Sequence, residues 1–218
     1  MARATTPPPP TLVLFVRHGQ TPTTGKVLPG RARGLHLAEA GQAQAAAVAE
    51  RIVALQTDKR RVAAVYASPL ERTQETAAPI ARALGLRIRR NQGLLEADFG
   101  EWTGAELKRL YKLPEWRTVQ RNPSGFRFPG GESFTEMQAR MVGAINDLVS
   151  EHPGQTIVAV SHADTIKAAV AEAIGTPLDL FQRIVIGQCS VSAVLYGPLG
   201  PTVLAVNHTG DLVSLVPS

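Results

Sequence analysis

The chain has 218 residues and a formal net charge of +5, from 23 basic and 18 acidic side chains. Apolar residues make up 44% and charged residues 19%, which is typical of a globular domain and excludes a wholly disordered chain. The single cysteine, Cys189, excludes an internal disulfide and favours a reducing compartment. We therefore expect a cytoplasmic protein.

Charge and hydropathy also narrow the kinds of partner. The positive charge suits a small anionic ligand, but it is too modest and too dispersed to indicate nucleic acid. No apolar run approaches the ~20 residues of a membrane-spanning helix, and Met1 to Pro10 lacks the apolar core of a secretory signal. We expect no nucleic acid and no membrane as partner, and a monomer or a homodimer.

In chain order, residues 1–10 end in the proline run Pro7 to Pro10, which can join neither a sheet nor a helix. We interpret them as a flexible tail. Residues 11–218 alternate apolar strand-like runs with helix-period segments, which predicts one α/β domain. Strands are expected at 12–16, 62–66, 157–160, 191–196 and 203–206, and helices at 35–55, from Ser68 onward, at 134–148 and at 164–174.

Two helix starts carry capping patterns. Ser68 is expected to cap a helix, with Pro69 at its first position and Glu71 three residues after the cap. Ser133 to Glu136 repeats the pattern before a helical stripe of apolar residues. Between these helices, residues 100–132 are irregular, and we expect them to form an insertion over the edge of the sheet that acts as a substrate lid.

The predicted lid carries six basic side chains and, among its aromatic ones, two tryptophans and two phenylalanines. They favour an anionic or polar substrate, with aromatic faces that stack on it; an ordinary surface with a few core aromatics is the alternative. The basic residues are Lys108, Arg109, Lys112, Arg117, Arg121 and Arg127, and these aromatic ones are Trp102, Trp116, Phe126 and Phe128.

Polar side chains follow three of the predicted strands. Arg17 and His18 end the first strand, Ser68 with Arg72 follows the second, and His162 ends the third. Ligands in open α/β sheets bind beyond the carboxyl ends of the strands. If the strands are parallel, two histidines and two arginines meet in one pocket.

These residue types suit phosphoryl transfer. Arginine offers a permanently charged fork that matches phosphate geometry, and a neutral imidazole is a nucleophile near pH 7. The leaving alkoxide needs a proton donor, for which Glu96 and Asp98 are the candidates. No metal-ligand spacing such as His-x-x-x-His is present, so a metal centre is not expected.

Five sequence blocks, in order, resemble the histidine phosphatase superfamily, which includes the cofactor-dependent phosphoglycerate mutases. The similarity spans about residues 11–207. The blocks are Arg17 to Thr21, Ser68 to Ala77, Leu95 to Gly104, Pro129 to Ser133 and Val160 to Asp164. A further stretch, Gly25 to Leu37, is similar to an actinobacterial-type branch labelled "probable phosphomutase".

The resemblance implies a fold and a role for each matching residue. The fold would be a three-layer α/β/α sandwich with a mostly parallel central sheet, without metal or cofactor. His18 would become phosphohistidine, Arg17 and Arg72 would clamp the phosphoryl oxygens with His162 as a further donor, and Glu96 would donate the proton.

Other polar residues near these blocks are candidates for substrate contact, although several could equally satisfy turn backbone groups. They are Gln20, Thr21, Thr24, Lys26, Arg31, Ser68 and Ser161.

The expected activity is a metal-independent phosphatase of small phosphorylated metabolites. A phosphoglycerate mutase or phosphomutase is the alternative, and a catalytically silent phosphate-binding or adaptor protein is the alternative of another class. The mutase branch typically has Arg-His-Tyr-Gly after the acid, whereas this chain has Ala97 to Gly100, and Asp98 would repel a bound carboxylate. Three cations on a different loop could bind such a carboxylate instead: Lys26, Arg31 and Arg33.

Overall fold

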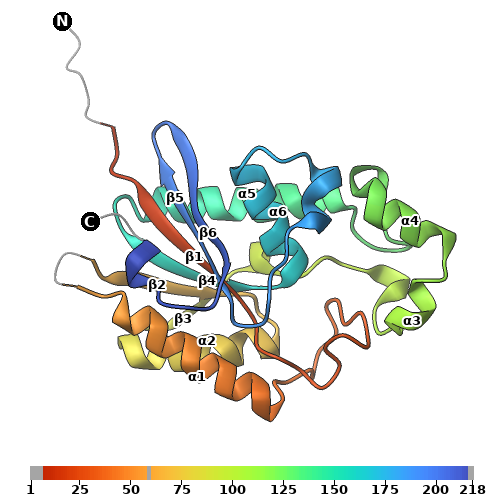
Figure 1. Cartoon of the computed structure of the whole chain (residues 1–218), viewed down its shortest axis with the longest axis horizontal. Helices are drawn as coiled ribbons and strands as arrows, with labels where there is room; N and C mark the ends of the chain where they lie inside the picture. Colours follow the sequence, from red (N-terminus) through yellow and green to blue (C-terminus); the bar gives the residue numbers. More distant parts are fainter. Residues whose placement is uncertain (1–6, 58–59, 216–218) are drawn as a thin grey trace, which may run out of the picture.

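The structure is a computed structural model and describes residues 7–57 and 60–215. A six-stranded sheet in the order β3-β2-β4-β1-β5-β6 runs through it (Figure 1). Four neighbouring strands are parallel: β3 (Ile88–Arg90), β2 (Val62–Ala67), β4 (Thr156–Ser161) and β1 (Thr11–Arg17). An antiparallel hairpin of β5 (Val191–Gly197) and β6 (Gly200–His208) extends the sheet beyond β1.

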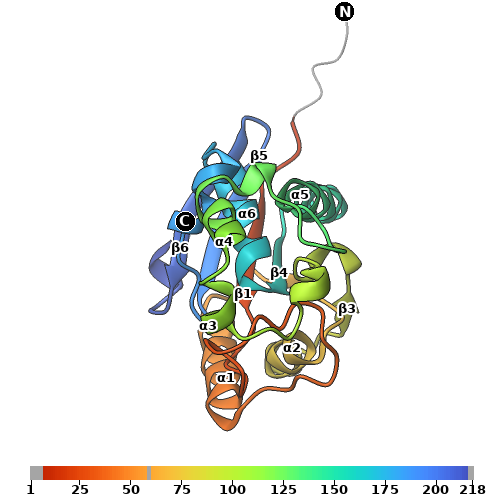
Figure 2. The same ribbon diagram turned by 90° about the vertical axis from the view of Figure 1, so that its right-hand side faces the viewer.

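Helices cover both faces of the sheet, as Figures 1 and 2 show. Alternate β1 residues such as Leu14 pack with α1 (Glu39–Ala54) and α2 (Glu71–Leu84). The residues between them, such as Phe15, pack with α5 (Phe134–Glu151) and α6 (Ala163–Ala173). Side chains alternate across a strand, so a strand with both faces covered is apolar throughout. The expected α/β sandwich with a mostly parallel sheet is confirmed, and of the six strands the sequence analysis missed one, the three-residue edge strand β3.

Two of the predicted helix starts are wrong. The helix α2 begins at Glu71 with Leu70 as its N-cap, rather than with Ser68 as its cap, because the Ser68 hydroxyl bonds the His162 ring instead. The helix α1 begins at Glu39 rather than near residue 35, because the segment before it is held in extended form by side-chain and backbone bonds. The capping box at Ser133 is confirmed, with bonds in both directions.

The insertion at 100–132 folds into α3 (Leu107–Leu110), α4 (Pro114–Arg121) and two short 3-10 turns. It packs against α5, α6 and the 3-10 helix Leu178–Arg183 through an aromatic cluster. Three of its five aromatic residues, Trp102, Phe126 and Phe128, are buried in that cluster. Its six basic side chains are all exposed.

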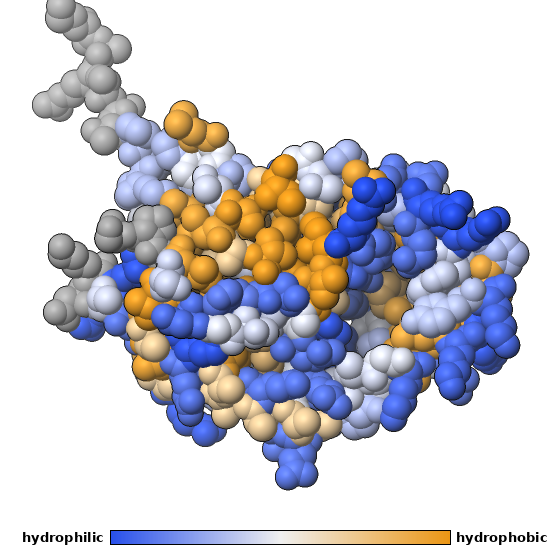
Figure 3. Space-filling model, in the orientation of Figure 1, coloured by the Kyte–Doolittle hydropathy of each residue, from blue (hydrophilic) through white to orange (hydrophobic). Residues whose placement is uncertain are grey.

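Two features lie away from the helical layers. Hydrophobic residues gather over β5 and β6 (Figure 3), where Val206 is exposed and Val203 is half-buried. Residues 1–6 of the predicted tail lie outside the described residues, and the Pro9 carbonyl accepts a bond from the Gly154 N–H at 3.0 Å. Within the described ranges, no helix combines the length and apolar character needed to cross a bilayer.

Candidate active site

The parallel register brings three strand ends to one edge of the sheet. Arg17 pairs with Ser161 across β1 and β4, and the His18 N–H donates to the Ser161 carbonyl at 3.0 Å. On the other side of β4, the Ser68 N–H donates to the Val160 carbonyl, also at 3.0 Å. The residues that follow the three strands are therefore neighbours, as the sequence predicted.

His18 is buried and uncharged. Its Nδ1 lies 2.8 Å from the Gly19 carbonyl, an acceptor, so Nδ1 carries the proton and Nε2 keeps its lone pair. Burial, aided by the charges of Arg72 and Arg17, lowers the pKa of His18 to about 3. Gly19 is required here because a Cβ would lie 2.6 Å from the Gly41 carbonyl oxygen. The site thus offers a neutral imidazole nitrogen in a fixed orientation.

Two arginines, the buried Arg72 and the half-buried Arg17, neighbour this ring. Arg17 donates to the Ile186 carbonyl at 2.6 Å, and Arg72 donates to the Gly30 carbonyl at 2.7 Å. Each bond uses one guanidinium nitrogen; the Nε of both arginines and Nη1 of Arg72 are buried without a hydrogen-bond partner in the described part of the chain. Burial lowers the pKa of each arginine, and both stay charged at neutral pH.

His162 is the third side chain of the site with a buried nitrogen that has no partner among the described residues. Its Nε2 lies 2.9 Å from the Ser68 hydroxyl, and its Nδ1 is buried without a partner among the described residues. Burial and the nearby cations lower its pKa, so the ring is neutral. If the Ser68 O–H donates to Nε2, the proton of His162 sits on Nδ1 and is free to donate. His162 is also the N-cap residue of α6, where the helix dipole favours an anion.

Glu96 differs sharply from Asp98. The Glu96 carboxyl is buried and accepts one bond, from the Ala97 N–H at 3.0 Å. Burial and the nearby Asp164 charge raise its pKa to about 7, against the opposing effects of the Ala97 N–H and the arginines. The Asp98 side chain is 42% exposed and ion-paired with Arg31 at 3.5 Å. With this raised pKa, Glu96 can hold a proton near neutral pH.

Three charged side chains hold the backbone that carries Glu96. Its carbonyl accepts from Arg31 at 2.9 Å and from Arg140 at 3.3 Å. Glu132 bridges both arginines, at 3.0 Å from Arg31 and 2.8 Å from Arg140, and its backbone N–H donates to the Asp98 carbonyl. The sequence analysis missed Glu132 and Arg140 as site residues, although Glu132 lies within a quoted block.

The predicted substrate-contact residues fall into two groups. Ser68 lies in the site, and Arg31 holds the Glu96 loop. The others are engaged in local bonds or are exposed. Thr21 and Thr24 bond to each other, the Ser161 hydroxyl donates to the Leu94 carbonyl at 2.7 Å, and Gln20 and Lys26 are exposed.

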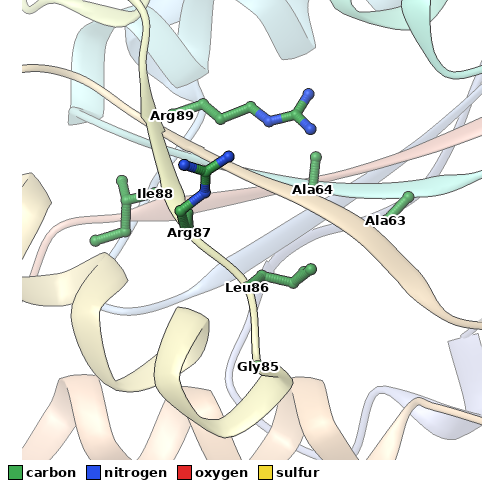
Figure 4. A pocket seen from close by; sticks show the side chains of 7 residues that line it. All are labelled: Ala63, Ala64, Gly85, Leu86, Arg87, Ile88 and Arg89. Atoms are coloured by element: carbon green, nitrogen blue, oxygen red, sulfur yellow. The ribbon is translucent and has the colours of Figure 1, made fainter.

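Other hollows lack this chemistry. A cavity of about 450 Å³ lies between the starts of β2 and β3, far along the strands from the site residues, and holds only alkyl groups and two arginines (Figure 4). One of these, Arg89, donates to the Tyr66 hydroxyl at 3.0 Å. A second hollow, of about 610 Å³, is lined by Arg31, Arg33 and Arg90 with Glu71 and Glu75. No group of three or more His, Cys, Asp or Glu residues in the described ranges is arranged to hold a metal ion.

The parallel α/β sandwich and the cluster of histidines and arginines at its strand ends define a phosphoryl-transfer type of site. Residues 13–209 match the histidine phosphatase superfamily (branch 1). The chain therefore belongs to this superfamily, and the resemblance found in the sequence is confirmed.

Named relatives include both phosphatases and mutases. "Phosphoserine phosphatase 1" of Hydrogenobacter thermophilus is 29% identical over 205 residues, covering 92% of this chain and 93% of the relative. "Probable phosphoglycerate mutase GpmB" of Cronobacter sakazakii is 34% identical over 187 residues, covering 84% of each. The chain spans 55% of the length of some mycobacterial relatives it matches at 31% identity, among them "Bifunctional protein Rv2228c" of Mycobacterium tuberculosis.

A solved structure supports the fold. The chain superposes on a mycobacterial glucosyl-3-phosphoglycerate phosphatase with a TM-score of 0.81 and 24% identity, covering 92% of this chain and all of the other.

Proposed function

We propose that this protein is a phosphatase of small phosphomonoesters that works through a phosphohistidine on His18. One observation carries the proposal. Four buried nitrogen atoms have no hydrogen-bond partner among the described residues, and they belong to Arg17, Arg72 and His162, the side chains that neighbour the neutral imidazole of His18. Burying unsatisfied donors is costly, and an anion with several acceptor oxygens would satisfy all four.

In the first step, Nε2 of His18 attacks phosphorus while the bond to the leaving oxygen breaks. Charge spreads over the three remaining oxygens in the transition state, where the arginines and His162 Nδ1–H are positioned to bind them. Glu96 gives its proton to the departing oxygen and becomes a carboxylate. The products are a free alcohol and a phosphohistidine.

In the second step, water attacks the same phosphorus. Glu96, now ionised, accepts a proton from that water, and the phosphorus–nitrogen bond breaks with its electron pair returning to Nε2. Inorganic phosphate leaves, and both His18 and Glu96 return to their starting protonation states. The raised pKa of Glu96 suits a group that must give and take a proton near neutral pH.

The test measures phosphate release from p-nitrophenyl phosphate by chelator-treated protein. The wild type should release phosphate. The reaction should be quenched in base rather than in acid, because the trapped phosphoprotein should be stable in base and labile in acid. His18→Ala should lose both turnover and the phosphoprotein. His36→Ala is the matched control, because His36 is exposed and lies outside the site; it should keep both.

Two results would reject the proposal. Substantial activity in His18→Ala would remove the nucleophile from this residue. Phosphate binding by the wild type without turnover of any monoester would instead favour a binding protein.

A further inference from the structure

A third cavity adjoins the site and has a different character. It has a volume of about 250 Å³ and lies between the insertion and α6. Its walls are mostly apolar and aromatic, and include Phe99, Tyr111 and Trp116. The space-filling view shows a hollow in the surface beside α3 and α4 (Figure 3).

Two residues in the wall of this cavity link it to residues of the site. Asp164, in its wall, follows His162 by two residues on α6, and its charge acts on both Glu96 and Arg17. Phe99, also in the wall, packs so closely on Gly30 that a Cβ on this glycine would lie 3.0 Å from its ring. The Gly30 carbonyl in turn accepts the bond from Arg72.

The charges in the wall cancel. Lys167 is the one cation among the residues that line this cavity, and its ammonium group lies 3.0 Å from the Asp164 carboxylate and 3.0 Å from the Gln182 amide oxygen. None of the six basic side chains of the insertion lines the cavity. A second anionic group of a substrate would find no free cation here and would lie near the Asp164 carboxylate, which repels it.

From this arrangement we infer that the cavity is the subsite for the alcohol part of the substrate, and that it selects a neutral, apolar or aromatic group. The inference rests on the proposed function, since it places the phosphoryl group of the same substrate on His18. It replaces the anionic or polar substrate expected from the basic residues of the insertion.

The volume of the cavity sets an upper limit on the size of the alcohol part of the substrate. An engineered apolar cavity of about 150 Å³ takes up benzene, so 250 Å³ accommodates a substituted ring or a short alkyl chain. Tyr111 is 56% exposed and Gln120 is exposed at the rim, so the cavity is open to solvent on one side. Binding sites of this kind combine apolar walls with a few fixed polar groups, here the amide of Gln182 and the Asp164–Lys167 pair.

The experiment uses primary n-alkyl phosphates from ethyl to octyl. Their leaving groups have nearly equal pKa values, so the demand on Glu96 is constant and only the buried apolar area changes. We expect kcat/KM to rise roughly fourfold for each methylene that enters the cavity and to level off once it is full. The kcat/KM values for phosphoserine and 3-phosphoglycerate should be lower than the value for hexyl phosphate.

Variants locate the effect. Tyr111→Ser should lower the ratio of the hexyl to the ethyl rate several-fold, because it removes a wall of the cavity. Leu113→Ser is the matched control: Leu113 is 38% exposed, lies in the same segment and does not line the cavity, so the ratio should not change. An equal fall in this ratio in both variants would overturn the subsite.

A binding measurement separates this inference from the proposed function. Hexylphosphonate and ethylphosphonate cannot be hydrolysed, and their dissociation constants report the subsite without turnover. Tighter binding of the hexyl compound in a protein that hydrolyses nothing would support the subsite and overturn the phosphatase. Hydrolysis with a kcat/KM that does not change with alkyl chain length, or with phosphoserine as the best substrate, would overturn the subsite. The proposed phosphatase activity would then still hold.

Discussion

The imidazole rings of His18 and His162 meet edge to face, with centroids 5.3 Å apart. His18 uses Nδ1 to bond the Gly19 carbonyl, and His162 uses Nε2 to bond the Ser68 hydroxyl. The two rings therefore keep opposite nitrogens for a ligand: Nε2 of His18 with its lone pair, and Nδ1 of His162, which carries a proton when the Ser68 O–H donates to Nε2. This difference underlies the proposed roles of His18 as nucleophile and His162 as donor.

The first prediction follows from that division. His162→Ala should lower kcat about 10²- to 10³-fold, as the loss of one transition-state donor does elsewhere, while the phosphoprotein still forms slowly. Ser68→Ala should give a smaller loss in the same direction, because the His162 tautomer is no longer fixed. Rapid-quench measurement of phosphoprotein formation checks both; a His162→Ala enzyme with unchanged rate would contradict the role.

The second prediction assigns the acid. Glu96→Gln should slow hydrolysis of ethyl phosphate about 10²- to 10⁴-fold and affect p-nitrophenyl phosphate far less, since its leaving group needs little protonation. Asp98→Asn is the matched control, because that carboxyl is partly exposed and paired with Arg31. If Asp98→Asn shows the selective loss instead, the acid is Asp98.

The third prediction concerns pH. The pKa of Glu96 is raised to about 7 and the donor must be protonated, so kcat/KM for alkyl phosphates should fall as pH rises through 7. The pKa of His18 is lowered to about 3, so its ring stays neutral and nucleophilic down to mildly acidic pH. In Glu96→Gln the alkaline fall should disappear; its persistence there would assign it to the substrate or to another group.

The fourth prediction treats Glu132 as a positioning residue. Glu132→Gln weakens the bridge between Arg31 and Arg140, which both hold the Glu96 carbonyl. We expect the loss to be larger for ethyl than for p-nitrophenyl phosphate, with KM nearly unchanged. Glu136→Gln is the control, since that carboxylate pairs with the exposed Arg127 away from Glu96. Equal losses with both substrates would indicate a merely structural role.

The fifth prediction separates phosphatase from mutase. A mutase must hold a second anionic group and return the phosphoryl group to a bound acid. Arg31 is already paired with Asp98 and Glu132, and Lys26 is exposed, so we expect water to be the main acceptor. Interconversion of 3-phosphoglycerate, primed with 2,3-bisphosphoglycerate, should be slower than phosphate release. The reverse order would make the protein a mutase with the same nucleophile.

The sequence by itself determined the layered fold, and it predicted which residues meet at the candidate site. The continuous apolar character of residues 12–16 follows from burial on both faces, and it was readable because it is a local pattern. The strand ends at His18, Ser68 and His162 were equally readable, and the parallel register brings them together. These features depend on residues that are neighbours in sequence and on the rule that ligands bind at the carboxyl ends of parallel strands.

Only the tertiary structure decided how the polar groups pair. Ser68 carries a helix-capping pattern, yet its hydroxyl bonds a histidine 94 residues away, which no local rule anticipates. Glu96 and Asp98 look alike in sequence, but Glu96 is buried with a raised pKa, whereas Asp98 is partly exposed and ion-paired with Arg31. The basic residues of the insertion suggested an anionic substrate, but their side chains face solvent while its aromatic ones build the core. Burial and partner choice depend on contacts between distant segments, and these determine pKa values and the polarity of a cavity.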